Sequence, residues 1–395
     1  TRFDRYVELM HRCGVADRIE IQHVAHHGPG GWASRTIEFT TVPVTDAATG
    51  KTLRLGFEEG LKPLLRALQE HLEQRGWLQR AMIHICDEPS RCNLRSWKAV
   101  SAAVHGAAPN LVRIDAIEAS DFTGALEVWV PKLSHLDAWY PWYRRAQQRG
   151  AELWFYICCH PYGGLYPNRF LDSPLMDVRL LHWINVAYEL DGYLHWGWNH
   201  WGKDPFGPLS DRLPPGDTHV IYPGPDGPLN SLRWEIQRES LEDFEYFWLL
   251  KQKLRRVQQE LGKPAGDLDP GQRSRELARQ LVRGFADIVR DPQRLAEVRK
   301  QLAREIIEAE MEPLTLLNTR PLDGTELAHG PAVIEVIGAT RPGAQVTISG
   351  NVIPIHPDGR FEEPVHVPAS KPTVRIIVTH NGRKRIFVRH FPVRH

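Results

Sequence analysis

Residues 18–261 alternate between short, apolar, β-prone runs and longer segments with helical periodicity. Runs such as AMIHIC (81–86) and AELWFYICC (151–159) are each followed by a loop and then by an amphipathic helix pattern. Strands that are connected through helices pair in parallel, because a parallel pair needs a crossover of at least that length. The alternation therefore predicts an α/β domain built on a parallel sheet.

The number of strands decides which parallel architecture is expected. Seven runs have the length and composition of strands: 18–24, 81–86, 111–117, 125–130, 151–159, 191–199 and 217–224. A closed (β/α)8 barrel needs eight. The chain opens with a helix pattern over residues 3–16, which is the element that would follow a first strand. We predict a (β/α)8-type barrel whose first strand is either missing or supplied by an upstream segment, with an open parallel sheet as the alternative.

The pattern changes twice towards the C-terminus. Residues 261–320 are predicted to form a helical extension or linker, and residues 321–395 contain short alternating strands broken by Gly, Pro and Asn-Gly turns. We therefore expect a barrel domain over residues 1–260, the extension, and a small C-terminal β-sandwich over residues 321–395, a size that folds on its own. The stretch GATRPGAQVTISG (338–350) resembles bacterial immunoglobulin-like modules, which implies a spacer or docking role.

Composition excludes several classes of partner. Lys and Arg total 49 against 48 Asp and Glu, so no basic surface for nucleic acid or acidic lipid is expected. No apolar run approaches the roughly 20 residues of a membrane helix, and the N-terminal residues lack a secretory apolar core. The five cysteines have irregular spacing that fits neither a disulfide framework nor a zinc site. We predict no nucleic-acid partner and no membrane insertion, and the oligomeric state stays open.

Two adjacent carboxylates, Asp87 and Glu88, end the strand 81–86 and precede Pro89. Functional groups of barrels lie at the C-terminal ends of strands. Two carboxylates held close together raise the pKa of one of them, which can then remain protonated near neutral pH and act as an acid. We expect Pro89 to hold the backbone of Glu88 extended. The alternative is that Asp87 only caps the following helix.

Seven stretches occur in the order found in the catalytic domain of glycoside hydrolase family 123. They are MIHICDEPS (82–90), IDAIEASDF (114–122), VWVPKL (128–133), WFYICC (154–159), YPNRFLDSPLMDVRLLHW (166–183), DGYLHWGWNHW (191–201) and IYPGPDGPLNSLRWEIQRESLEDFEYFWLL (221–250). The chain resembles that family over residues 3–260. The resemblance implies a β-N-acetylgalactosaminidase-like enzyme with substrate-assisted retention, in which Glu88 is the general acid and base and Asp87 orients the 2-acetamido group of the sugar.

An independent argument supports a nucleophile supplied by the substrate. The two carboxylates of conventional glycosidases lie about 5 Å or more apart, on opposite sides of the scissile bond. Adjacent residues at one strand end do not easily straddle a sugar ring. We therefore predict a glycan substrate, a glycolipid or an oligosaccharide with a terminal 2-acetamido sugar, and no cofactor. The alternatives are a glycosidase for another sugar and a catalytically silent glycan-binding protein, and the resemblance favours a secreted or periplasmic location.

Aromatic and polar residues near the other strand ends are candidates for substrate contacts. The chain contains 13 tryptophans, and indole rings stack on the apolar faces of sugars. The predicted substrate-binding residues are His26, Trp129, Tyr156, His160, Trp196, Asn199, Trp201 and Tyr222. Core packing is the alternative for the tryptophans.

Three histidines, His23, His26 and His27, lie together in QHVAHHGPGG (22–31). No carboxylate accompanies them at close spacing in the sequence, so a metal site is not predicted there. We expect His26 to contact a sugar hydroxyl instead.

Overall fold

The computed structural model describes residues 1–15, 17–207, 213–327, 332–368 and 370–393. The chain separates into two compact units. The first contains residues 1–162 and 190–196, and the second contains residues 163–189 and 197–395. Each unit is described by itself below.

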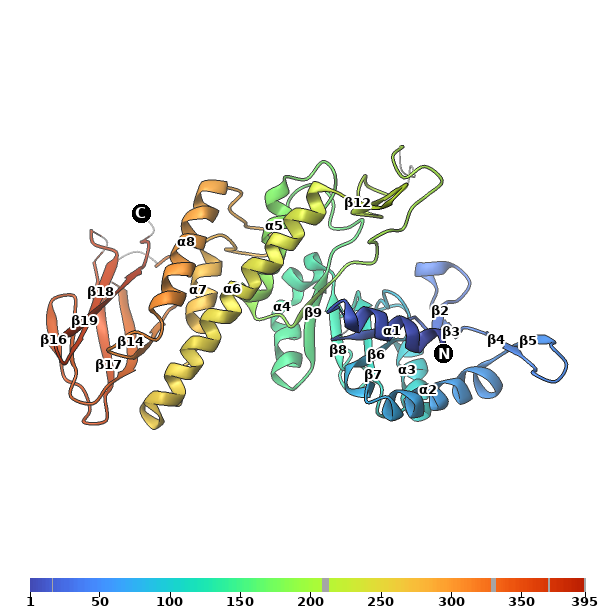
Figure 1. The fold of residues 1–395 in the computed structure, drawn as a ribbon, viewed down its shortest axis with the longest axis horizontal. Helices are drawn as coiled ribbons and strands as arrows, with labels where there is room; N and C mark the ends of the chain where they lie inside the picture. The colour runs from blue at the N-terminus through green and yellow to red at the C-terminus, as the bar shows by residue number, and fades with distance from the viewer. Residues whose placement is uncertain (16, 208–212, 328–331, 369, 394–395) are drawn as a thin grey trace. The chain divides into compact units, whose positions relative to one another are not determined.

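The first unit is built on a six-stranded parallel sheet with the strand order β1-β6-β7-β8-β9-β10 (Figure 1). The strands are β1 (Ile19–Ile21), β6 (Ala81–His84), β7 (Val112–Ile117), β8 (Val128–Pro131), β9 (Glu152–Tyr156) and β10 (Gly192–Leu194). The sequential order and parallel pairing confirm the predicted parallel sheet. Because all C-terminal strand ends lie along one edge, side chains from distant parts of the sequence meet there.

Helices and two hairpins complete this unit. The helices are α1 (Arg2–Arg12), α2 (Lys62–Gln74), α3 (Leu94–Ala107) and α4 (Leu133–Gln148), with short helical turns η1 (Gly31–Ala33), η2 (Phe57–Leu61) and η3 (Leu78–Arg80). The hairpins pair β2 (Ala25–His27) with β3 (Ile37–Phe39), and β4 (Val42–Thr45) with β5 (Thr52–Leu55). Both hairpins lie between β1 and α2 in the chain.

Both faces of the parallel sheet are buried, as is usual for such sheets. One face carries an apolar cluster that includes Met82, Ile114, Val130 and Tyr156. Trp97 of α3 lies completely buried and packs edge-on against Phe122. Burying apolar side chains of this size contributes about 1.5–3 kcal/mol each. The strand ends that carry the polar residues described below are thus held on a rigid base.

The second unit contains the long helices and all the remaining strands. Its helices are α5 (Leu175–Tyr188), α6 (Leu232–Leu261), α7 (Gln272–Arg279) and α8 (Pro292–Glu308), with the turn η4 (Lys263–Ala265). The hairpin of β11 (Ile221–Gly224) and β12 (Gly227–Asn230) precedes α6, whose first turn is capped by Ser231. In Figure 1, α6, α7 and α8 lie side by side.

Two antiparallel sheets at the C-terminus enclose a common apolar core. One contains β13 (Thr315–Arg320), β14 (Ala332–Thr340) and β17 (Arg360–Val367); the other contains β15 (Gln345–Ile348), β16 (Asn351–Ile353), β18 (Thr373–His380) and β19 (Arg383–His390). This arrangement is the predicted sandwich, but β13 precedes residue 321, so the sheets begin earlier than expected. Its likeness to immunoglobulin-like modules stays a prediction.

The predicted barrel is confirmed only in part. Within the described residues the parallel sheet has six strands and is not closed by eight. The segment 217–224, expected as the last strand of the sheet, instead supplies β11, which pairs antiparallel with β12. The hairpin forms because PGPDG (223–227) is a turn sequence that lets the chain fold back on itself. No helix in the described part of the chain is both long and apolar enough to cross a membrane.

Candidate active site

A buried carboxylate on β7 fixes the chain where β6 ends. Asp115 is completely buried and accepts hydrogen bonds from the backbone N–H groups of Ile85 (3.1 Å) and Cys86 (2.9 Å). The indole N–H of Trp97 donates to the same carboxylate at 2.8 Å. Charge-assisted bonds of this kind are about twice as strong as neutral ones. The residues that follow, Asp87 and Glu88, therefore start from a fixed backbone.

A second network holds the backbone of Asp87 itself. The Asn93 side-chain oxygen accepts from the Ser90 N–H at 2.9 Å, which leaves its amide nitrogen to donate to His27 Nδ1 at 3.4 Å. His27 Nε2 must then carry the ring proton, and it donates to the carbonyl oxygen of Asp87 at 2.7 Å. The hairpin residue His27 therefore positions Asp87 through its main chain and leaves the Asp87 carboxyl group unengaged by this contact.

The carboxyl group of Asp87 lies in an environment that favours its protonated form. Burial, followed by the neighbouring carboxylates of Glu88 and Asp115, raises the pKa of Asp87 to about 7 against the opposing effect of His84 and Lys132. The side chain still has half of its surface exposed. Near neutral pH the Asp87 carboxyl group therefore titrates, so the raised pKa predicted for one member of the pair falls on Asp87 and not on Glu88, the acid that the family resemblance implies.

Glu88 has a left-handed backbone conformation, with φ of 46°. The expectation that Pro89 would hold it extended is therefore wrong. Proline excludes the right-handed helical region for the preceding residue, and here the chain uses the left-handed region instead. Such a conformation costs a residue with a side chain about 1–3 kcal/mol and persists only where its surroundings impose it. The turn directs the Glu88 side chain towards the ends of β8 and β9.

Three donors from separate elements face the Glu88 carboxyl group, whose side chain is 17% exposed. The Tyr156 hydroxyl at the end of β9 donates to Oε1, and the Trp32 indole N–H of η1 donates to Oε2 at 3.1 Å. Lys132, directly after β8, places Nζ 3.5 Å from Oε1. The group is thus held in one orientation by contacts on both oxygens.

Lys132 connects Glu88 to a further carboxylate. Its Nζ donates to Oε1 of Glu118 at 2.5 Å, and Glu118 follows directly after β7. Burial lowers the pKa of Lys132, but the carboxylates of Glu88 and Glu118 outweigh that effect and raise it overall. The ammonium group therefore stays charged, and it neutralises part of the negative charge at this edge.

Replacing Tyr156 by Phe removes one hydroxyl group from the Glu88 environment. A hydrogen bond to a charged group contributes about 1.5–3 kcal/mol, so a reaction that passes through ionised Glu88 should fall about 10- to 100-fold in kcat/KM. Tyr143→Phe is the matched control, because that buried hydroxyl donates to the Ala119 carbonyl oxygen at 3.0 Å and does not contact Glu88. Equal activity of the Tyr156→Phe variant and the wild type would show that Tyr156 only fills space.

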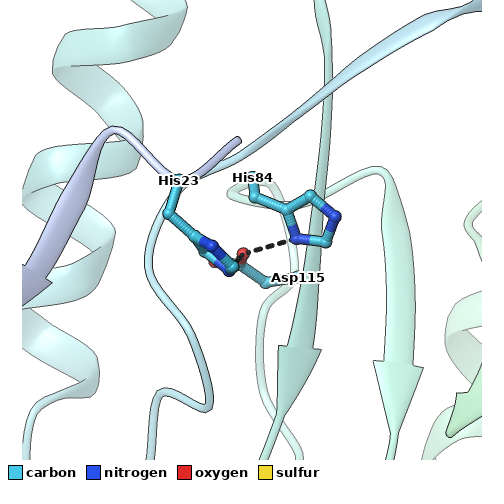
Figure 2. Close-up of side chains that lie close together, drawn as sticks. All are labelled: His23, His84 and Asp115. Atoms are coloured by element: carbon cyan, nitrogen blue, oxygen red, sulfur yellow. Dashed lines mark hydrogen bonds and ion pairs between the residues drawn. The ribbon is translucent and has the colours of Figure 1, made fainter. Parts of the chain in front are cut away.

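A third polar group lies beside the pair: His23, His84 and Asp115 (Figure 2). His84 Nδ1 lies 3.3 Å and His23 Nε2 3.8 Å from Asp115 Oδ1. Burial lowers the pKa of His84, but Asp115 and Glu20 overcome this and raise it to about 9. The pKa of His23 is lowered, first by burial. These three residues are of the types that bind metal ions.

The structure places the predicted contact residues of the first unit in different environments. Trp129 is 3% exposed and donates to the Leu126 carbonyl oxygen, so it belongs to the core and its predicted stacking on sugar is wrong. Tyr156 reaches Glu88, as described. His26 on β2 and His160 after β9 are exposed, and Trp196, which is 45% exposed, stacks on His195 after β10.

Three predicted contact residues belong to the second unit and gather around β11. The backbones of Asn199 and His219 form an isolated antiparallel β-bridge, and the Trp201 indole N–H donates to the Ile221 carbonyl oxygen at 2.7 Å. The Tyr222 hydroxyl accepts from Arg233 at 3.4 Å. These residues thus form one polar and aromatic group within their unit, and their roles in binding substrate stay predictions.

Four functional candidates were missed in the sequence: Asp115, Glu118, Lys132 and Trp32. Glu118 directly follows the predicted strand 111–117, and Lys132 lies two residues after the end of the predicted strand 125–130, so the rule that selected Asp87 would have found both. Asp115 was detectable as a lone acid inside an apolar strand. Trp32 gave no signal, because it lies in a Gly-rich turn far from any predicted strand end.

Comparison with known proteins identifies the family of the chain. The family model of the glycoside hydrolase 123 catalytic domain matches residues 1–250. The chain belongs to glycoside hydrolase family 123. No curated protein matches the sequence.

Solved structures extend the family 123 assignment to the fold. The structure of a family 123 glycoside hydrolase from Clostridium perfringens, studied for the details of glycolipid glycan hydrolysis, is similar with a TM-score of 0.51 and 18% identity. The match covers 76% of this chain and 56% of that enzyme, so this chain spans little more than half of its length. The likeness shows a mixed α/β fold with a curled, half-barrel parallel sheet.

An endo-beta-1,4-mannanase from Thermotoga petrophila matches at a TM-score of 0.24 and 13% identity, over 85% of this chain and 70% of that one. A score this low carries no argument about the family 123 domain.

Proposed function

We propose that this family 123 domain is a retaining exo-glycosidase that releases a β-linked N-acetylgalactosamine residue by substrate-assisted catalysis. The glycan would be of the kind carried by glycolipids or oligosaccharides. The observation that carries the proposal is the adjacency of Asp87 and Glu88 at one strand end, with Glu88 anchored by three donors and Asp87 half exposed beside it. Both carboxyl groups thus come from one side, which favours an attacking atom that belongs to the substrate.

In the proposed reaction, protonated Glu88 gives its proton to the glycosidic oxygen as the bond from that oxygen to the anomeric carbon breaks. The carbonyl oxygen of the substrate's 2-acetamido group forms the new bond to the anomeric carbon. Ionised Asp87 accepts the acetamide N–H and aligns the group. Glu88 then takes a proton from a water molecule, which opens the oxazoline-type intermediate, and two inversions give net retention.

Glu118 raises the question of a second mechanism, because its carboxylate and that of Glu88 contact the same Lys132 ammonium group. A retaining pair of two separated carboxylates would use Glu118 as the nucleophile. Its pairing with Lys132 supports an electrostatic role instead.

Replacing Glu118 by Gln distinguishes these mechanisms. If Glu118 only supports Lys132, kcat/KM should fall at most about 100-fold, as for loss of one charge-assisted hydrogen bond. A nucleophile would cost on the order of 10⁵-fold or more. Mass spectrometry of the denatured enzyme after mixing with a 2-fluoro sugar substrate provides the second readout. A sugar attached to Glu118 would contradict the substrate-assisted mechanism.

The pH dependence tests the role of Asp87. Because the pKa of Asp87 is raised to about 7, the ionised form becomes predominant only above that pH. If ionised Asp87 aligns the acetamide, kcat/KM should rise as the pH increases through about 7, and Asp87→Asn should remove that rise. The profile should be measured with EDTA present. A fall through the same pH that Asp87→Asn abolishes would make Asp87 the proton donor.

The substrate test compares an aryl N-acetyl-β-galactosaminide with the corresponding aryl β-galactoside. The proposal expects hydrolysis of the first alone and strong inhibition by a thiazoline analogue of the intermediate. Equal cleavage of both would exclude the acetamide mechanism. If the chain binds the N-acetyl-β-galactosaminide without cleaving it, the alternative of a catalytically silent glycan-binding protein would be supported.

A further inference from the structure

His23, His84 and Asp115 bring three metal-binding atoms together from three separate segments. His23 follows β1, His84 ends β6 and Asp115 lies on β7, three consecutive strands of the sheet. The candidate ligand atoms lie within 4.8 Å of one another, and both imidazole rings point towards the Asp115 carboxylate (Figure 2). The carboxylate of this group comes from a strand about 90 residues after His23.

The spacing of these atoms fits a small divalent ion. Bonds from zinc to imidazole nitrogen and carboxylate oxygen are about 2.0–2.2 Å long, so tetrahedral ligand atoms lie about 3.3 Å apart. His84 Nδ1 is 3.3 Å and His23 Nε2 is 3.8 Å from Asp115 Oδ1. Small side-chain rotations, of His23 above all, would complete the three contacts.

The surroundings of the three residues resemble the outer shell of a metal site. Asp115 Oδ2 accepts from Cys86 N–H and the Trp97 indole, which fixes the carboxylate while Oδ1 faces both histidines. The distal nitrogen of His84, Nε2, lies 3.7 Å from a carboxylate oxygen of Glu20. Metal-bound histidines usually have such a partner for their second nitrogen, because it orients the ring.

The donor set selects the class of metal. Two imidazole nitrogens and one carboxylate oxygen suit zinc and neighbouring transition metals, whereas calcium and magnesium prefer oxygen ligands alone. Three protein ligands leave one coordination position open. Asp87 Oδ1 lies 4.0 Å from His23 Nε2, so the proposed site adjoins the carboxyl group that orients the substrate in the proposed function.

We propose that His23, His84 and Asp115 form a binding site for a divalent transition metal of the zinc class, and that metal bound there inhibits hydrolysis by engaging Asp87. The inhibitory part rests on the proposed function; the binding part does not. The competing interpretation is a hydrogen-bonded cluster in which His84 and Asp115 share a proton through the same atoms.

Calorimetric titration of the EDTA-treated full chain with ZnCl₂ tests the binding. One equivalent of zinc should bind to the wild type. His23→Gln should raise the dissociation constant about 100-fold or more, since loss of outer-shell partners alone lowers metal affinity 10- to 100-fold. Glu20→Gln should weaken it about tenfold. His105→Gln removes an exposed histidine of α3 outside the cluster and should leave binding unchanged. Equal zinc affinity of the wild type and His23→Gln would overturn the proposal.

Cobalt gives a readout that does not depend on the stability of a variant. CoCl₂ added to the wild type should give the intense visible absorption of a four-coordinate ion, and excess ZnCl₂ should remove it. A weak, six-coordinate spectrum would indicate nonspecific surface binding and overturn the proposal. His84→Gln, checked for its fold by circular dichroism, should lose the strong absorption.

Inhibition is measured separately as the ratio of activities with and without ZnCl₂. The wild type should lose activity at the zinc concentration that saturates the calorimetric site and regain it with EDTA, whereas the ratio should stay near one in His23→Gln. Zinc binding by a chain that cleaves no glycoside would contradict the proposed function and leave the binding site supported. Binding without any loss of activity would refute the inhibitory part.

Discussion

Glu88→Gln is expected to lower kcat/KM for an N-acetyl-β-galactosaminide with an alkyl leaving group by about 10³- to 10⁴-fold, at the upper end of what general acid catalysis contributes. Glutamine keeps the size of the side chain and a carbonyl oxygen to accept from Tyr156, but it has no acidic proton. The loss should be much smaller, about tenfold, for a nitrophenyl leaving group, which departs without protonation.

Asp87→Asn is the matched comparison for this result. It removes the acceptor that aligns the acetamide, so it should impair substrates with good and poor leaving groups to a similar extent. Steady-state kinetics of both variants on both substrates give four ratios of kcat/KM for variant and wild type. If Asp87→Asn spared the activated substrate and Glu88→Gln did not, the two roles would have to be exchanged.

Arg273→Met is expected to destabilise the second unit by about 3–5 kcal/mol, the usual cost of breaking a buried ion network by removing one partner. The Arg273 guanidinium is 5% exposed and contacts three carboxylates: Glu276 at 3.0 Å, Glu305 at 2.7 Å and Asp323 at 2.5 Å. Without it, the three carboxylates would keep only the guanidinium of Arg389, which lies 3.7 Å from Glu276, to offset their mutual repulsion. The network also links α7 to α8 and to the residues after β13.

Urea unfolding followed by circular dichroism measures this effect. Arg320→Met provides the control, because that side chain is 74% exposed and its ion pair with Glu335, at 3.3 Å, should contribute less than about 1 kcal/mol. Lowering the pH should destabilise the second unit in the same way as the substitution does. Burial raises the pKa of Glu305, but the contacts with Arg273 overcome this and lower it to about 2, so the stabilisation is complete above about pH 4.5 and is lost as the pH falls towards 2. An unchanged unfolding midpoint in Arg273→Met would show that the network contributes no net stability.

The sequence predicted the parallel sheet well because strand and helix periodicities differ and alternate. It also located Asp87 and Glu88, since a strand followed by two acids is a local pattern. Closure of the barrel was not predictable in the same way. Residues 217–224 have the composition of a strand, and only the turn after Tyr222 decides that the segment pairs with β12 rather than with the sheet.

The contacts around the carboxyl pair depended on long-range pairing and were therefore harder to predict. Trp129 and Tyr156 are aromatic residues near predicted strand ends, yet one lies in the core and the other contacts Glu88. Asp115 and His84 become neighbours only because β6 and β7 are adjacent and parallel in register, with His84 opposite Ile114. Such register is set by the whole sheet and not by the residues themselves.

The positive φ of Glu88 has a consequence for how this protein can change over generations. Glycine adopts that conformation without cost, and asparagine adopts it more easily than glutamate does. Replacing Glu88 by Gly or Asn would therefore relieve the backbone strain, but it would also remove the contacts with Tyr156, Trp32 and Lys132. Position 88 therefore combines a strained backbone with the side chain that the proposed reaction requires.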